Sequence, residues 1–254
     1  MSEDILSYIN YRHVFDIKED TDTDYRCPSC GGSLRCEKGD IRYRETLESK
    51  SLRHDECWEH DWVEYNFSAS LICKSCHEIV YCIGVGSLTG LSIYGSEEDL
   101  AKLEPEDWVS RDFIPKYFVP PLKLIQIPDA CPDAVKEDIN NSFALAFCDF
   151  SASGNKIRSA LEKLTLDLLP GSTATFHKRL EDLNQIDQEA SDILMSIKWL
   201  GNEASHESSL QQFDLAYAFD ALSYALIRIY DDGPKRIRGF SRMINSQKGS
   251  IAKT

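Results

Sequence analysis

Two short cysteine motifs constrain the fold of this chain more than any other feature. "CPSCGG" places Cys27 and Cys30 in one tight turn, and "CKSC" repeats the same spacing at Cys73 and Cys76. This spacing lets both sulfurs of a turn reach one ion, so two such turns on neighbouring hairpins complete a tetrahedral site. Because four thiolates leave no open position for water, the motifs predict a structural zinc ion. Four buried, reduced thiols are the alternative interpretation.

Other cysteines and histidines offer further metal ligands. Cys36 and Cys82 are each able to replace a ligand of the predicted four-thiolate set. The segment "HDECWEH" provides a second candidate metal site, formed by His54, Cys57 and His60. The spacing of these three residues is irregular and their surroundings are charged, so an ordinary solvated loop is the alternative.

The clearest strand runs into the second cysteine motif. In "VEYNFSASL" apolar residues alternate with polar ones, at Val63, Tyr65, Phe67, Ala69 and Leu71. This alternation is typical of a strand with one buried face. "EIVYCIGV" leaves the motif as the next strand. The pattern therefore predicts a β-rich zinc ribbon over residues 1–90, with the metal at the strand ends.

Residues 91–131 are expected to connect the ribbon to a second domain. The glycines of "GVGSLTG", just before this segment, do not have the spacing of a phosphate-binding loop, so this stretch is also interpreted as linker. The later segment "FIPKYFVPPLKLIQIP" contains four prolines, which favour extended chain. Its aromatic and aliphatic side chains suit packing along a surface.

From Pro132 onward the hydrophobic period is that of helices. Apolar side chains repeat along "NKIRSALEKLTLDL" at Ile157, Ala160, Leu161, Leu164 and Leu168. Asp187 is a candidate cap for "QEASDILMSIKWL", and Ser209 with Gln212 forms a capping box before the last helix. That last helix is apolar nearly all round, which predicts a central position in a bundle.

Charge is distributed unevenly along the chain. The net charge is −14 at pH 7; the first 233 residues carry −20, whereas residues 234–254 carry +6 and no acidic side chain. An acidic body repels phosphate backbones, which argues against a general nucleic-acid binder. The basic tail is expected to be disordered and solvated, although its charge also suits RNA or an acidic partner.

These elements predict an α+β protein of the cytoplasm. Residues 1–90 are expected to form a zinc ribbon and residues 91–131 a proline-rich connection. Residues 132–233 are expected to form an all-α helical bundle, and residues 234–254 a basic, disordered tail. The first residues, "MSEDILSYIN", carry acids where a secretion signal needs basic residues. The longest apolar stretch is too short to span a membrane. Nine cysteines then indicate metal ligands and reduced thiols.

The segment "IKWLGNEASHE" raises the question of catalysis. In a continuous helix, Lys198, Asn202 and His206 are spaced four residues apart and form a row open to solvent or to another subunit. If the helix ends at Gly201 and Asn202, the same residues line a loop. A solvated polar face is the alternative to an active site.

The cysteine motifs, the proline-rich connection, "NKIRSALEKL" and "IKWLGNEASH", in this order, resemble the domain of unknown function family 4145, whose helical domain is similar to HEPN domains. The resemblance covers residues 24–232. It implies a bundle that forms homodimers, and many HEPN domains are metal-independent ribonucleases with an arginine, an asparagine and, four residues later, a histidine. Asn202 and His206 match this motif, whereas Gly201 stands in place of the arginine and Lys198 is the nearby basic residue.

If the resemblance extends to RNA cleavage, it implies roles for four residues. His206 would act as general base or acid, and Asn202 would orient the phosphate or the imidazole. Lys198 or Arg158 would neutralise charge on the transition state. Arg158 has the alternative role of a surface ion pair with Glu162, one helical turn away.

The missing arginine and the acidic body favour a function without catalysis. We expect a non-catalytic or regulatory binding module of a bacterial defence or toxin–antitoxin system, with a structural zinc, a homodimer through the bundle and a protein partner. The alternatives are an antitoxin-like inhibitor of a basic protein and a metal-independent endoribonuclease that uses His206 with Asn202 and Lys198. A docking module needs an exposed apolar patch, whereas a ribonuclease needs a positive groove.

Overall fold

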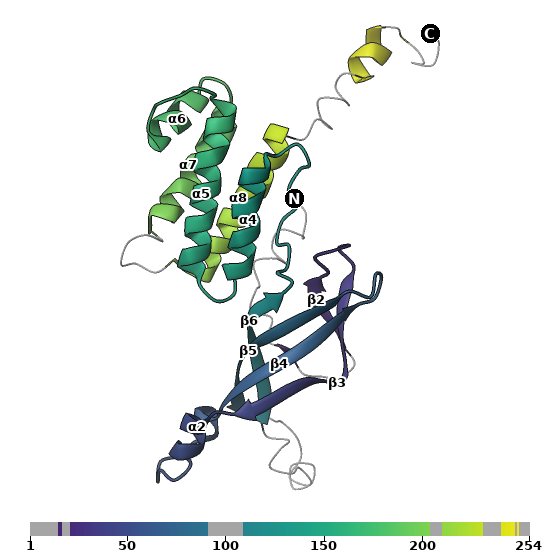
Figure 1. The fold of residues 1–254 in the computed structure, drawn as a ribbon, viewed down its shortest axis with the longest axis vertical. Helices are drawn as coiled ribbons and strands as arrows, with labels where there is room; N and C mark the ends of the chain where they lie inside the picture. Colours follow the sequence, from purple (N-terminus) through teal and green to yellow (C-terminus); the bar gives the residue numbers. More distant parts are fainter. Residues whose placement is uncertain are drawn as a thin grey trace, which may run out of the picture. The chain divides into compact units, whose positions relative to one another are not determined.

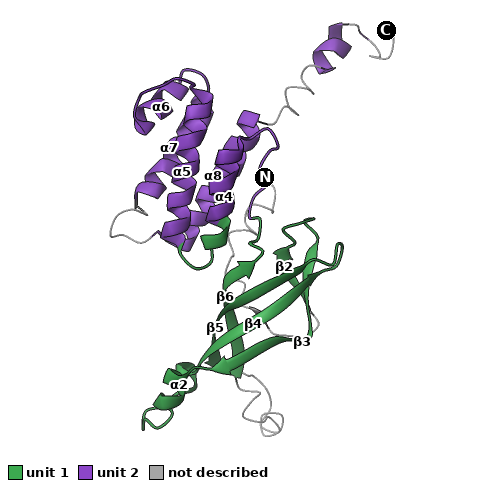
Figure 2. Ribbon diagram, viewed as in Figure 1, with its two compact units in different colours: residues 1–123, 143–149 green, residues 124–142, 150–254 purple. Residues whose placement is uncertain are grey.

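An antiparallel sheet comes first along the chain and a set of helices follows it (Figure 1), which confirms the predicted α+β class. The computed structural model describes residues 15–16, 21–90, 109–203, 210–230, 240–246 and 248. The chain divides into two units (Figure 2). One comprises Met1–Lys123 and Phe143–Asp149, and the other comprises Leu124–Ser142 and Phe150–Thr254.

The N-terminal unit is built on a six-stranded antiparallel sheet with the order β1-β6-β5-β4-β3-β2. Its strands are β1 (Phe15–Asp16), β2 (Thr21–Arg26), β3 (Ser33–Glu45), β4 (Glu64–Cys73), β5 (Ile79–Gly90) and β6 (Val109–Val119). Tight turns join β2 to β3 and β4 to β5, and these turns carry the two cysteine motifs. The longer connection from β3 to β4 contains helix α2 (Leu47–Leu52) and a short 3-10 helix, η1 (His60–Trp62).

Strand β4 has the alternating burial that its sequence predicts. The buried side chains on one face are Tyr65, Phe67, Ala69, Leu71 and Cys73. Phe67 meets Phe113 of β6 edge-on, with 4.8 Å between ring centroids. A slip of one residue would turn this whole apolar set to the other face of the sheet, so its burial fixes the strand register.

The sheet extends beyond the predicted ribbon boundary at residue 90. β5 continues to Gly90, through the stretch interpreted as linker. β6 lies inside the predicted connection and pairs with β5 from one end to the other. The prediction of a connecting segment over residues 91–131 is therefore wrong for residues 109–119, which belong to the sheet.

A local irregularity explains how a proline enters β6. Pro115 lies where the β5–β6 register shifts, between Ile83 and Gly84, and prolines are accommodated in strands at such bulges. Gly84 has no side chain, which lets the Ile114 backbone carbonyl approach it closely. The prolines alone do not predict this strand, because the bulge arises only when the two strands pair.

The helices described after the sheet are α4 (Asp133–Leu145), α5 (Phe150–Leu168), α6 (Phe176–Leu183), α7 (Gln188–Glu203) and α8 (Gln212–Tyr230). Helix α5 buries most of its predicted stripe, at Ile157, Ala160, Leu161 and Leu164. Asp187 caps α7 as predicted, because its Oδ1 accepts a hydrogen bond from the Ala190 backbone N–H at 3.1 Å. Ser209 of the predicted capping box lies outside the described residues.

Helix α8 differs from the predicted central helix. One side is buried, at Leu215, Ala216, Ala218, Phe219, Leu222, Ala225 and Leu226. Another side exposes a stripe of large side chains, at Phe213, Tyr217, Tyr224 and Ile227. An apolar composition therefore does not place this helix at the centre. No helix in the part of the chain that the structure describes is long and apolar enough to cross a membrane.

Part of the basic tail is helical. The sequence predicts a disordered tail over residues 234–254, but residues 240–246 form a helix. Phe240, Met243 and Ile244 are spaced so that they share one side of this helix, and all three are exposed. The tail thus contains an amphipathic element in addition to its charge.

Candidate metal centre and the polar row of helix α7

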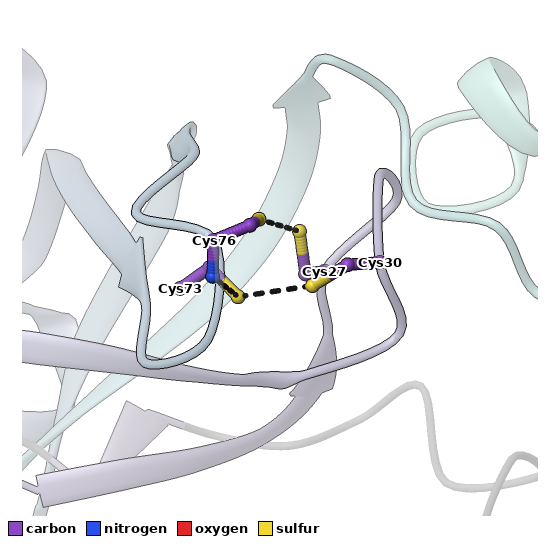
Figure 3. Close-up of side chains that lie close together, drawn as sticks. All are labelled: Cys27, Cys30, Cys73 and Cys76. Carbon is purple, nitrogen blue, oxygen red and sulfur yellow. Dashed lines mark hydrogen bonds between the residues drawn. The ribbon is translucent and has the colours of Figure 1, made fainter.

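The four cysteines of the two motifs come together at one end of the sheet (Figure 3). Strands β3 and β4 pair so that Leu34, near the start of β3, lies opposite Cys73, at the end of β4. The β2–β3 turn and the β4–β5 turn are therefore neighbours, as the sequence predicts for hairpins that share an ion. All four sulfurs lie within 4.8 Å of one another.

The sulfur positions fit a tetrahedral ion. Cys27 Sγ lies 3.6 Å from Cys76 Sγ, and Cys30 Sγ lies 3.4 Å from Cys73 Sγ (Figure 3). Four metal–sulfur bonds of about 2.3 Å in tetrahedral geometry separate the sulfurs by roughly 3.8 Å. Four soft donors in this arrangement suit zinc or iron. The cluster is thus a candidate metal centre.

Backbone N–H groups stabilise the thiolate form of Cys73. The N–H groups of Cys76 and Ser75 donate to Cys73 Sγ at 3.5 and 3.4 Å, and they lower the pKa of the Cys73 thiol to about 6. The Gly32 N–H donates to Cys30 Sγ at 3.4 Å. Such donors favour the charged form of a thiol, which is the form that binds metal.

The two turns share a backbone conformation. The residue after the second cysteine is left-handed in both, with φ of 73° at Gly31 and 60° at His77. The N–H of each donates to the carbonyl of the first cysteine of its turn, Cys27 at 2.9 Å and Cys73 at 3.0 Å. Glycine adopts this conformation without a steric penalty, which accounts for Gly31 in the first motif. In the second motif the left-handed residue is His77, and a histidine does not reveal this conformation in the sequence.

The other candidate ligands do not join this centre. Cys36 and Cys82 are buried in the core of the sheet, and burial raises the pKa of the Cys82 thiol. Among the described residues, the four motif cysteines form the only close group of three or more metal-ligating side chains. His54, Cys57 and His60 are all described, so the structure does not gather them into a second site.

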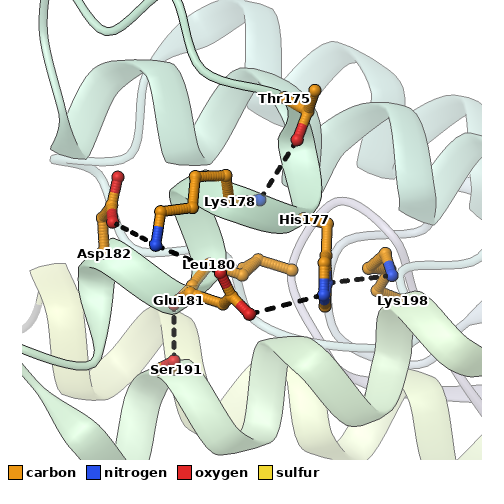
Figure 4. A network of polar contacts seen from close by, with 8 residues as sticks. All are labelled: Thr175, His177, Lys178, Leu180, Glu181, Asp182, Ser191 and Lys198. Carbon is orange, nitrogen blue, oxygen red and sulfur yellow. Dashed lines mark hydrogen bonds and ion pairs between the residues drawn. The ribbon is translucent and has the colours of Figure 1, made fainter.

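Lys198 lies in the helical interior rather than on a solvated row. Its exposed fraction is only 7%. The Nζ atom lies 3.3 Å from Nδ1 of His177 on α6 (Figure 4), and 3.9 Å from the ring centroid of Trp199. The prediction that Lys198 faces solvent or another subunit is therefore wrong, because α6 packs against α7. A desolvated ammonium needs such polar and aromatic partners.

His177 is the candidate that sequence reasoning missed. Its Nε2 lies 3.6 Å from Oε1 of Glu181, one turn further along α6, and Lys178 Nζ lies 3.2 Å from Oε2 of the same carboxylate. The imidazole thus stands between Lys198 and Glu181 (Figure 4). The spacing of His177 and Glu181 is visible in the sequence. The contact of His177 with Lys198 joins two helices and is not visible in the sequence.

The predicted row is only partly described. Helix α7 continues through Gly201 and Asn202 to Glu203, so it does not end at the Gly-Asn pair. Lys198 and Asn202, four residues apart in this helix, therefore lie on the same side of α7. His206 lies outside the described residues.

Arg158 and Gly201 meet where α5 crosses α7. Gly201 is buried, and a Cβ atom added to it would lie 3.1 Å from Cβ of Arg158. The Arg158 Nε lies 3.4 Å from Oε1 of Glu162, which is the helix-surface ion pair offered as its alternative role. The glycine at the position of the motif arginine thus has a packing reason, because the Arg158 stem lies against it.

Two family matches divide the chain in the same order as the fold. Residues 15–118 match the family described as Domain of unknown function (DUF8608), and residues 140–247 match Domain of unknown function (DUF4145). The resemblance to family 4145 is thus confirmed for the helical region, whereas the sheet with both cysteine motifs matches a separate family. No curated protein and no solved structure matches the chain. The helical region of this chain is therefore similar to DUF4145 domains, and the sheet that precedes it is similar to DUF8608 domains.

Proposed function

We propose that this protein is a non-catalytic binding module of a bacterial defence or toxin–antitoxin system. It docks a protein partner on its sheet and pairs with a second copy through its helices. The observation that carries this proposal is an apolar strip on the outer face of β5 and β6. Six side chains of the strip are between 42% and 62% exposed: Ile79, Tyr81, Ile83, Val85, Tyr117 and Val119.

The strip is continuous across the two strands. Tyr81 pairs with Val119 and Ile83 pairs with Tyr117, so the side chains of each pair stand on one face of the sheet. On the other side of β5, β4 presents Ser68 opposite Ile83, which gives the strip a polar border. Six half-exposed side chains of this size offer on the order of 500 Å², comparable with the patches that mark protein interaction sites.

In this proposal the four motif cysteines hold a structural zinc ion. Four thiolates at nearly tetrahedral separations fit zinc and leave no coordination position for a water or a substrate. The ion would hold the β2–β3 and β4–β5 turns together and would take part in no reaction. All nine cysteines are free of disulfides, which suits the reducing cytoplasm, the compartment that we infer.

Charge substitutions in the strip test the docking function. Ile83→Glu places a carboxylate at the centre of the strip, and Ser68→Glu places the same charge on the neighbouring strand, outside it. A partner is first identified by purifying the wild-type chain from its native host, and its affinity for each purified variant is then measured. We expect Ile83→Glu to weaken binding by about tenfold or more and Ser68→Glu to leave it nearly unchanged. Equal affinity of both variants would contradict docking on the strip.

A metal-independent endoribonuclease is the second candidate function. The buried Lys198 beside His177, on the helix that carries Asn202, favours it, because clustered titratable groups in partly desolvated positions are typical of functional sites. In this mechanism His206 is the general base or acid and Asn202 orients the phosphate. Lys198 and Arg158 neutralise the charge that develops on the transition state.

RNA cleavage in the presence of a chelator separates the two functions. The experiment compares the wild-type chain with His206→Ala, and with Ser205→Ala as a control in the same segment. Cleavage that is lost in His206→Ala and kept in Ser205→Ala would establish the ribonuclease. Absence of cleavage by a folded wild-type chain, over a range of labelled single-stranded and structured RNAs, supports the binding module.

A further inference from the structure

A groove with apolar and acidic side chains lies at the start of α7. Its volume is about 530 Å³, and its lining includes two isoleucines and three acids from the start of α7 and the turn before it, with one arginine of α8. The isoleucines are Ile186 and Ile193, and Ile186 is 68% exposed. An exposed isoleucine inside a concave surface indicates a position that a ligand side chain can cover.

The charge of this groove is negative. The lining carboxylates are Asp187, Glu189 and Asp192, and the cation is Arg228. Arg228 is already engaged, with its Nε 2.8 Å from Asp187 and its Nη1 2.7 Å from Glu189. Asp192 is exposed at the surface. Three carboxylates against one guanidinium leave a net negative potential, which attracts a basic ligand.

The exposed stripe of α8 extends the apolar surface from the groove. Tyr224 connects the two, because its hydroxyl donates to Oε1 of Glu189 at 2.6 Å. Phe213, Tyr217 and Ile227 lie on the same side of α8 and are exposed. The groove and the stripe together offer an apolar surface bordered by acids, which is the kind of surface that receives an amphipathic helix.

The basic tail has the complementary features. In its helix, residues 240–246, Phe240, Met243 and Ile244 lie on one side and are each 43–45% exposed. Residues 234–254 contain six basic side chains and no acidic one. The family match of the helical region runs to residue 247 and so includes this helix. An apolar face with basic neighbours matches an apolar groove with acidic neighbours.

We infer that the tail helix of one copy seats in the groove of a second copy, with Met243 and its neighbours against Ile186 and Ile193 and with Arg242 toward Asp192. The tail's apolar side chains are exposed in the single chain, and the groove of a second copy offers a surface that covers them. Exchange of two tails between two grooves gives a closed, symmetric dimer. The inference rests on the proposed homodimer and names the surface that forms it.

Sedimentation of the full chain over a concentration series tests this contact. Met243→Glu puts a charge on the apolar face of the tail helix, and Asp192→Lys reverses a charge in the groove. Glu137→Lys makes the same charge change at an exposed position of α4, outside the groove, and serves as the control. We expect the first two substitutions to raise the dimer dissociation constant by about tenfold or more and Glu137→Lys to leave it unchanged. Combining Asp192→Lys with Arg242→Asp should restore most of the lost affinity.

The outcomes distinguish this inference from the proposed function. If Met243→Glu and Asp192→Lys form a dimer as stable as that of the wild-type chain, tail exchange is wrong and the homodimer forms through another surface. A wild-type chain that is monomeric at every concentration overturns the homodimer itself. If Arg242→Asp abolishes binding of single-stranded RNA and has no effect on the dimer, the tail is a nucleic-acid arm and the inference is wrong.

Discussion

Asp220 is partly buried and lies along α8 between Tyr217 and Tyr224, two of the exposed side chains of this helix. Desolvation raises the pKa of Asp220 from 3.8 to about 6. A carboxyl whose folded-state pKa is raised favours the folded state when it is protonated. Its contribution is fully present below the unfolded-state pKa and is lost as the pH rises through about 6. Charged Asp220 therefore lowers the stability of the helical unit at neutral pH.

Replacing this aspartate should change stability in a pH-dependent way. We expect Asp220→Asn to unfold like the wild-type chain near pH 4 and to be more stable by about 1 kcal/mol near pH 8, since partial exposure screens the full effect. Urea unfolding followed by helical circular dichroism at both pH values measures the difference between the two chains. A difference that does not change with pH would contradict the assignment to Asp220.

At the scale of elements, the crossing of α5 and α7 depends on a residue without a side chain. Gly201 is buried, and Arg158 of α5 fills the space where its Cβ would lie, at 3.1 Å. Glycine inside a helix costs about 1 kcal/mol relative to alanine, so this position is tolerated for its packing. The close approach holds the Arg158 stem against α7 while its guanidinium pairs with Glu162.

Substitutions at Gly201 should separate the effect of helix propensity from the effect of packing against Arg158. Gly201→Ala raises helix propensity, but its Cβ makes a tight contact with Arg158. Because these effects oppose each other, we expect the free energy of unfolding to change by less than about 1 kcal/mol. Gly201→Leu needs space that Arg158 occupies, so we expect a loss of about 2 kcal/mol. Denaturant unfolding of both variants provides the measurement. A leucine variant as stable as the alanine variant would show that α5 can move away at no cost.

At the scale of the whole molecule, the two units have separate sources of stability. The sheet carries the candidate metal centre at its turns, whereas the helices pack through apolar stripes and contribute none of the four cysteines. A structural zinc ion in such a site contributes on the order of 10 kcal/mol to the segment that it folds. Metal loss is therefore expected to act on one unit only.

Removal of the metal should unfold the ribbon end of the sheet and leave the helices folded. We expect a strong chelator, or Cys27→Ser, to abolish amide-exchange protection in β2–β5 while helical circular dichroism persists. Cys57→Ser, an exposed cysteine outside the four-cysteine group, is the matched control and should behave like the wild-type chain. Full protection of these strands in a chain shown to be free of metal would exclude a structural ion.

The sequence predicts the cysteine part of the candidate site from local spacing, but it does not predict the contacts between helices α6 and α7. The spacing of Cys27 and Cys30 and of Cys73 and Cys76 is a local signal, because each pair shares one turn. The burial of Lys198 is not predictable from a helical wheel, because the wheel contains no information on α6. His177 was missed for the same reason, since its importance comes from a contact 21 residues away in the chain.

Local sequence is enough to predict the separate elements: the alternation of β4, the stripe of α5, the cap at Asp187 and the two cysteine turns all depend on neighbours within a few residues. Tertiary packing is needed to explain why β6 joins the sheet through a bulge at Pro115 and why Arg158 lies against Gly201. It also decided that one side of α8 stays exposed. These outcomes depend on which elements pack together, and the free energy of that packing comes from residues far apart in the chain.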